Sequence, residues 1–166
     1  SIRHGGSNIG AGIEINGLTL GGVGTGTVID HVEVVANQDD GIEWFGGSVN
    51  VSNVVVWNVG DDGLDTDQGW SGTCSNFFVV TCTNSAMELD GPEGTPLGNG
   101  NHTFSNGVIH SGLVADDIID FDDETNVTIN DVYFDQIEDT VEVTGYAGGA
   151  LFNVSISNWE HTLSNG

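Results

Sequence analysis

The chain almost lacks basic residues. Of its 166 residues only Arg3 is basic, whereas 25 are acidic, so the formal net charge is −24 at pH 7. Such a charge repels polyanions at ordinary salt concentrations, which excludes nucleic acid as a partner. No run of 18 apolar residues occurs either, so we expect no insertion into a membrane. The acidic excess has to be neutralised by bound cations, a salty habitat or a cationic partner.

Cysteine and helical periodicity are also scarce. Cys74 and Cys82 are eight positions apart, about 26 Å in an extended strand, so we expect buried thiols and no disulfide. The 26 glycines and the many β-branched residues favour strands joined by tight turns. The length suits a single domain over residues 1–166. No signal peptide precedes Ser1, so we expect a mature or excised piece.

An apolar–acidic–any triplet recurs along the chain. Its acidic centres are Glu14, Glu43, Asp65, Glu88, Asp120 and Glu142. Intervals of 22 or 23 residues indicate a base period of about 22, and the longer intervals of 29 and 32 indicate inserted loops at "GLTLGGVGTGT" and "GPEGTPLGNGN". This period predicts an all-β solenoid, a parallel β-helix of about six to seven coils.

A polar pair in each β-branched stretch repeats with the same period. The pair ends in asparagine at Asn53, Asn76, Asn106 and Asn153, with His31 and Asp131 at the matching places. An asparagine at the corner of a coil can use its side-chain amide to bond the coils above and below. We therefore predict a structural ladder of stacked asparagines.

Stacking also places the acidic centres in one line. Equivalent residues of neighbouring coils lie about 4.8 Å apart, and alternation sends each acid outward while its apolar neighbours point inward. Carboxylates at this spacing repel by about 3 kcal/mol per pair at an effective dielectric near 20. We therefore expect an acidic ladder on one face, with something to offset the repulsion.

Calcium is the predicted ligand of this face, because Ca²⁺ takes six to eight oxygen ligands from carboxylates, carbonyls and water. The candidate metal ligands are Asp39, Asp40, Asp61, Asp62, Asp65, Asp67, Asp120, Asp122 and Asp123. Neither "DTDQG" nor "DFDDE" has the spacing of an EF-hand loop, so the prediction rests on composition. A solvated acidic surface in a salty habitat is the open alternative.

The segments "SIRHGG", "NQDDGIEWFGG" and "MELDGPEG" resemble β-helix repeats of secreted bacterial surface proteins, and the chain resembles the pectin-lyase-like superfamily of right-handed parallel β-helices. The resemblance implies a secreted or cell-surface location. "QDDG" and "GDDG" are also similar to the paired motifs of polygalacturonase-type glycoside hydrolases, in which Asp40, Asp61 and Asp62 would be the catalytic trio. However, the Gly-His-Gly and Arg-Ile-Lys motifs of those enzymes have no counterpart.

We therefore predict a non-catalytic structural or adhesive module with a calcium-binding face, and an inverting hydrolase of polysaccharides as the alternative. Both ends look uncapped, so the chain is either a piece of a longer β-helix or a protomer that associates end to end. Trp44 is expected in the core. Trp70, in the polar turn "DQGWSG", is the best candidate for an exposed ring that stacks on a sugar.

Overall fold

The computed structural model describes residues 1–10, 15–92, 94, 100–110, 117–122, 124–137, 144–146 and 153–163. Its strands form two sheets, and within each sheet neighbouring strands run parallel to one another. The seven-stranded sheet contains, in spatial order, β1 (Ile2–Arg3), β3 (Ile29–Val35), β5 (Val51–Val59), β7 (Thr73–Cys82), β9 (His102–His110), β11 (Asn126–Ile137) and β13 (Asn153–Leu163). The six-stranded sheet contains β2 (Leu18–Gly21), β4 (Ile42–Phe45), β6 (Leu64–Asp67), β8 (Met87–Leu89), β10 (Ile119–Phe121) and β12 (Thr144–Tyr146).

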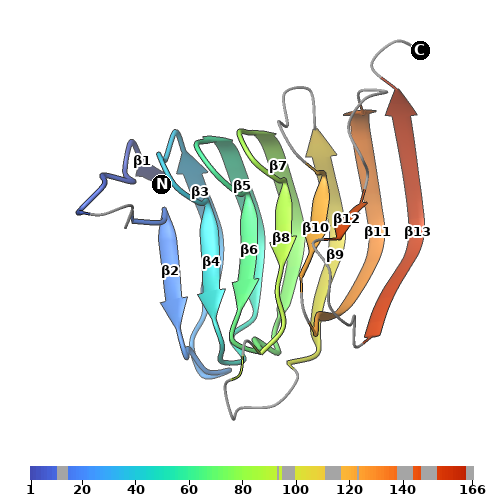
Figure 1. Cartoon of the computed structure of the whole chain (residues 1–166), viewed down its shortest axis with the longest axis horizontal. Helices are drawn as coiled ribbons and strands as arrows, with labels where there is room; N and C mark the ends of the chain where they lie inside the picture. The colour runs from blue at the N-terminus through green and yellow to red at the C-terminus, as the bar shows by residue number, and fades with distance from the viewer. Residues whose placement is uncertain are drawn as a thin grey trace.

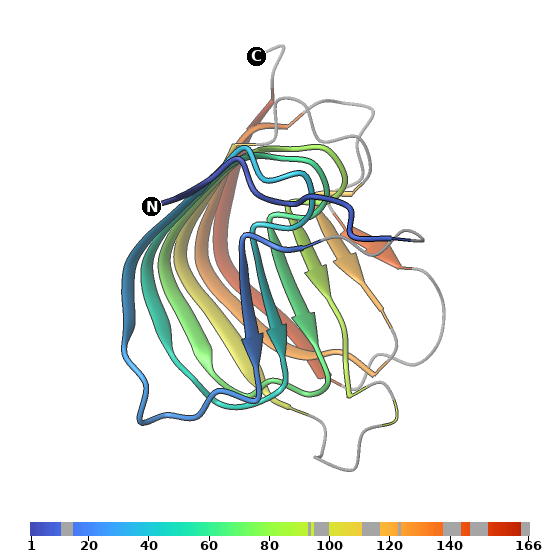
Figure 2. The same ribbon diagram turned by 90° about the vertical axis from the view of Figure 1, so that its left-hand side faces the viewer.

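The chain alternates between the two sheets and so winds as a solenoid. Figure 1 shows the coils following one another from the N-terminal to the C-terminal end, and Figure 2 shows the long strands curving around one side of the coil. The solenoid has about five turns with a period of about 25 residues. The predicted class, a parallel β-helix, is confirmed, but the coils are fewer and longer than predicted because the longer loops lengthen the period. The described part of the chain contains no helix long and apolar enough to cross a membrane.

Bends in the long strands are made by residues in the left-handed conformation. Asn53, Asn76 and Asn106 lie at the same place in successive long strands, each between two paired residues, and have φ between 54° and 56°. Asparagine tolerates this region better than most residues. The Nδ2 of Asn76 donates to Oδ1 of Asn53 at 3.2 Å, and Nδ2 of Asn53 donates to Oδ1 of Asp30 at 2.6 Å. The predicted asparagine ladder is present at these three positions.

The fourth predicted member of the ladder is wrong. Asn153 pairs with Asn126 at the start of β13, whereas Asn158, with φ of 51°, occupies the place next to Asp131 in the ladder. The triplet "ISN" that ends at Asn158 repeats "VSN", "CSN" and "FSN" of the earlier coils. That triplet was the signal that would have found the correct residue.

The interior is a continuous apolar stack. Ile42, Leu64, Met87 and Ile119 are register partners and are fully buried. Equivalent residues of neighbouring coils therefore bury one another's side chains, which a single coil could not do alone. Cys74 and Cys82 are free thiols within this core, as predicted.

Two tryptophans stack inside the solenoid. The rings of Trp44 and Trp70 lie 4.6 Å apart, and both are fully buried. The prediction for Trp44 is confirmed, but the prediction of an exposed Trp70 is wrong. The indole Nε1 of Trp70 donates to the carbonyl of Val49 at 3.1 Å. The polar N–H group therefore has a hydrogen-bond partner inside the core, although the surrounding turn is polar.

Candidate functional site

A row of carboxylates runs along the outward face of the six-stranded sheet. Glu43, Asp65, Glu88 and Asp120 are register partners on β4, β6, β8 and β10. Their neighbours along the strands, such as Ile42 and Trp44, point into the core. The alternation of inward apolar and outward acidic residues therefore holds over four successive rungs.

The two ends of the predicted acidic ladder differ from the prediction. Thr19 is the partner of Glu43, and Gly145 is the partner of Asp120. Glu14 and Glu142, the residues predicted for these rungs, lie outside the described residues. The prediction of the first rung is wrong because β2 lies in "GLTLGGVGTGT". Its strand has no acidic centre, so the spacing of acidic centres predicts an inserted loop there.

A second acidic row flanks the first. Asp67 lies two residues after Asp65. The backbone N–H of Asp90 donates to the carbonyl of Thr66, and the N–H of Asp122 donates to the carbonyl of Leu89. These bonds place Asp90 and Asp122 in the same row on the next two coils. The predicted ligands Asp67, Asp120 and Asp122 therefore share this face. Asp123 lies outside the described residues.

Two aspartates of the preceding turn bond one coil to the next. Oδ1 of Asp40 accepts the backbone N–H of Asp62 at 3.0 Å, and Oδ1 of Asp62 accepts the N–H of Ser85 at 2.6 Å. The side-chain amide of Asn84 donates to the other oxygen of Asp62 at 3.2 Å. These two carboxylates therefore occupy equivalent structural positions on successive coils.

Three buried carboxylates converge beside this turn. One oxygen each of Asp40, Glu43 and Asp65 lies within 4.8 Å of the other two, and the residues are only 7%, 7% and 6% exposed. Asn16 donates its side-chain amide to Glu43. Oδ1 of Asp65 is buried without a hydrogen-bond partner. We call these three residues the buried triad.

Burial makes the charged forms of the triad costly. The pKa of Asp40 is raised to about 8 and that of Glu43 to about 9, mainly by burial and in smaller part by the neighbouring carboxylates. The pKa of Asp65 is raised well above its ordinary value for the same reasons. At neutral pH these oxygens must therefore share protons or contact a cation.

The donor set of the buried triad fits a divalent cation. All three ligands are hard carboxylate oxygens, and the unpartnered Oδ1 of Asp65 offers a lone pair that no protein donor uses. A second, half-buried group of Asp39, Asp40 and Asp61 has oxygens equally close together. These two groups are the sets of three possible ligands that lie within 4.8 Å of one another among the described residues.

The structure thus brings together part of the predicted ligand set. Asp39, Asp40, Asp61 and Asp65 belong to one or both groups, whereas Asp62, Asp67, Asp120 and Asp122 belong to neither. Glu43 was predicted as a rung of the ladder and was missed as a ligand. Its position next to Asp65 in the aligned repeats, three residues after Asp40, was the signal that pointed to it.

Comparison with known families agrees with this architecture. Residues 1–164 match the family described as a pectate-lyase-like β-helix domain. The chain belongs to this family. No curated protein and no solved structure gives a significant match. Membership of the pectate-lyase-like β-helix family fits a carbohydrate-related or surface β-helix. It assigns no role to the acidic face, because function depends on the residues of a site and not on the fold.

Proposed function

We propose that this pectate-lyase-like β-helix domain is a calcium-binding structural module of a secreted or cell-surface protein. The buried triad is the observation that carries the proposal. Three carboxylates within 4.8 Å of one another, each more than nine-tenths buried, form a pocket of negative charge. Each pair repels by about 3 kcal/mol at an effective dielectric near 20 when both members are ionised, and a divalent cation would offset this.

The chemistry of the ligands favours calcium over softer metals. Neither histidine nor cysteine belongs to the two groups of close ligands among the described residues, and oxygen ligands suit Ca²⁺ and Mg²⁺. Ca²⁺ accepts irregular geometry, whereas Mg²⁺ demands a near-ideal octahedron. Extracellular modules typically bind Ca²⁺ with dissociation constants of about 10⁻⁴ to 10⁻³ M, so a location outside the cell would keep such a site occupied.

A cation in the triad would act as a link between coils. Asp40 and Glu43 belong to the coil of β4, whereas Asp65 lies on β6 of the next coil. One ion bound by all three would hold these coils together and replace a mutual repulsion with a shared attraction. The proposed role is therefore rigidity of the solenoid, which a structural or adhesive module needs.

The environment of Asp62 argues against the hydrolase alternative. An inverting hydrolase needs two accessible carboxyl groups about 6.5 to 9.5 Å apart with a water molecule at the sugar. Asp62 is only 2% exposed, and both of its oxygens accept hydrogen bonds from the next coil. Asp40 is also buried and bonds the backbone of Asp62. Structural roles for Asp40 and Asp62 account for the similarity to the paired aspartate motifs.

Thermal unfolding with and without calcium tests the proposal. We expect the Tm to rise when 5 mM CaCl₂ replaces EDTA at matched ionic strength, because a five- to fiftyfold excess over such dissociation constants stabilises the folded state by about 1 to 2.3 kcal/mol. Asp65→Asn should weaken calcium binding at least tenfold in calorimetric titration. The same substitution should raise the Tm in EDTA at pH 8, because it leaves two coupled carboxyl groups in place of three and so lowers the cost of ionising the site as the pH rises.

Asp120→Asn is the matched control, since Asp120 lies in the same row but outside both close groups. It should leave the calcium response unchanged. Coincident melting curves in EDTA and calcium would refute the proposal, and so would an equal response to calcium in the Asp65→Asn variant. Loss of the response in Asp61→Asn alone would assign the ion to the half-buried group instead.

A further inference from the structure

An apolar patch lies on the outside of the seven-stranded sheet, in the part of the strands that follows the corner asparagines. Val55, Trp57 and Phe78 are 37%, 52% and 42% exposed there. The inward residues beside them are buried and supply the core, namely Val54, Val56, Phe77 and Val79. The exposed side chains are thus additional to the core, and a contiguous apolar patch on a surface marks a site of binding. We call Val55, Trp57, Phe78 and Val80 the apolar platform.

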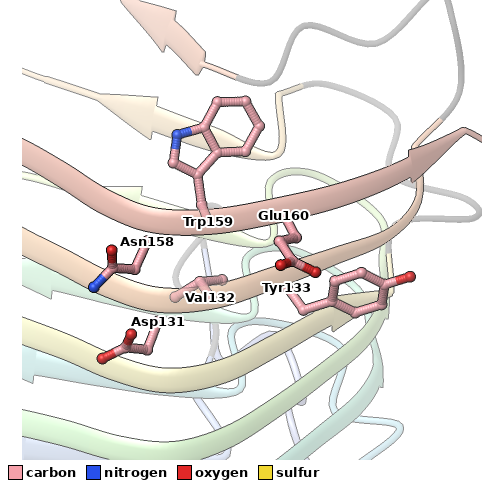
Figure 3. A pocket seen from close by; sticks show the side chains of 6 residues that line it. All are labelled: Asp131, Val132, Tyr133, Asn158, Trp159 and Glu160. Carbon is pink, nitrogen blue, oxygen red and sulfur yellow. The ribbon is translucent and has the colours of Figure 1, made fainter.

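The platform is built from two rows of outward side chains on neighbouring strands. One row contains Val55, Phe78, Val108 and Tyr133, and the other contains Trp57, Val80, His110 and Asp135. Figure 3 shows Tyr133 on the side of the strands opposite to the ring of Trp159, and the register partner of Trp159, Val132, is buried. Tyr133 and its row therefore face outward. A shallow hollow of about 360 Å³ lies here, and it is lined by the four residues of the platform and by His110.

A hydrogen-bonded pair of polar side chains borders the hollow. Nδ1 of His110 lies 2.9 Å from Oδ2 of Asp135, and the hydroxyl of Thr162 donates to Oδ1 of Asp135 at 2.9 Å. The hydrogen bonds from His110 and Thr162 lower the pKa of Asp135, so this carboxylate is ionised at neutral pH and takes the Nδ1 proton of the imidazole as its donor. Because the imidazole is 29% exposed, its Nε2 is the nitrogen that a ligand hydroxyl can reach. An apolar surface with a fixed polar group at its edge is the usual composition of a ligand site.

The size and charge of the site restrict the ligand. A stable protein interface uses about 20 to 30 residues on each side, whereas five residues line this hollow. A net charge of −24 repels polyanions. The hollow is shallow, so one face of a bound ring stays in water, which disfavours a wholly apolar ligand. The remaining class is a neutral ring that has an apolar face and a polar edge.

We propose that the apolar platform binds a neutral glycan made of pyranose rings with equatorial hydroxyl groups. In such a ring the C–H bonds point to the two faces and the hydroxyls lie at the edge. One face would pack on Trp57 and Phe78, which offer large rigid contact areas, while a hydroxyl bonds Nε2 of His110. Asp135 is a positioning residue that holds the imidazole in place. The platform lies on the other sheet from the buried triad, so this inference does not depend on the calcium site.

Calorimetric titration of the full chain with cellohexaose, a neutral β-1,4-linked glucan, tests the site. We expect binding that Trp57→Ala weakens at least tenfold. Trp159→Ala is the matched control, because Trp159 is 47% exposed but does not line the hollow. Its affinity should equal that of the unmodified protein. The β-1,4-linked hexaglucuronate has the same ring geometry but a carboxylate on every ring, so it should bind at least tenfold more weakly than cellohexaose.

The substitution His110→Phe provides a second measurement, because it keeps an aromatic ring but removes both nitrogens. It should weaken the binding of cellohexaose at least fivefold while leaving the urea midpoint of unfolding unchanged. No binding at millimolar cellohexaose would overturn the inference, and so would equal affinities of Trp57→Ala and the unmodified protein or tighter binding of hexaglucuronate. Sedimentation coefficients that rise with protein concentration, and cease to do so in Trp57→Ala, would assign the platform to a second copy of the chain and overturn the inference as well.

Discussion

On the six-stranded sheet the outward residues Glu43 and Asp65 are acidic yet buried, whereas on the seven-stranded sheet the outward residues Trp57 and Phe78 are aromatic yet 52% and 42% exposed. The polarity of an outward side chain therefore does not predict its exposure in this solenoid. The packing of neighbouring side chains decides it, because equivalent residues stack at about 4.8 Å and cover one another. The two faces consequently pose opposite physical problems, a buried charge and an exposed apolar surface.

The largest expected effect compares one tryptophan from each sheet. Trp44 on β4 stacks on Trp70 in the core, whereas Trp57 on β5 is half-exposed. Trp44→Ala should lower the free energy of unfolding by about 3 to 5 kcal/mol, because it leaves a large cavity. Trp57→Ala should lower it by less than about 1 kcal/mol. Urea denaturation followed by circular dichroism measures both, and equal losses would show that the two faces do not differ as described.

An intermediate effect is expected from pH in the presence of EDTA. The pKa of Asp40 is raised in the folded state to about 8 from 3.8, so the folded protein binds an extra proton between these values. This contribution to stability is complete below pH 4 and is lost as the pH rises to about 8. Between pH 6.5 and 9 the loss should be about 2 kcal/mol from Asp40 alone, since one pKa unit corresponds to about 1.4 kcal/mol.

That pH range also avoids an opposing contribution from His102. Burial lowers the pKa of this imidazole to about 4, so it costs stability only as the pH falls below about 6.5. Urea denaturation at pH 6.5 and pH 9 in EDTA makes the measurement. Calcium should diminish the loss, because the ion holds the triad ionised at both pH values. A stability that does not change over this range would mean that the carboxylates are not buried as described.

The smallest expected effect concerns the exposed face. Phe78 lies with Val55 and Trp57 beside a shallow hollow on the outside of the seven-stranded sheet. Phe78→Ser should change the free energy of unfolding by no more than about 0.5 kcal/mol, because surface substitutions of this kind disturb little packing. The same denaturation assay checks it. A loss above 2 kcal/mol would show that this face is covered in the folded protein.

The repeat was readable because stacking demands the same residue type at each coil. The acids at 43, 65, 88 and 120 and the asparagines at 53, 76 and 106 recur at positions that the register confirms. The predicted register failed where the repeated residue type changes. Thr19 and Gly145 occupy rungs without an acid, so an alignment on acidic centres could not place them.

Exposure could be predicted less well than register. Trp70 lies in a turn rich in polar residues, but the bend of that turn sends its indole inward against Trp44 and toward the carbonyl of Val49. Alternation indicated that Glu43 and Asp65 point outward, which is correct, but it gave no sign that they are buried. Both cases depend on contacts between residues 21 to 27 positions apart, such as the hydrogen bond from Asn16 to Glu43.

The repeated residue types were enough to predict the class of fold, four rungs of the line of carboxylates and three of the corner asparagines, since a solenoid repeats local patterns and each coil must present the same residue types to its neighbours. Only the tertiary structure decided which carboxylates converge, because the turn that carries Asp40 folds its oxygen toward Glu43 and Asp65. It also decided that Trp57 is half-exposed while Trp70 is buried. Convergence and cover are properties of neighbouring coils in space, and no periodicity along the chain encodes them.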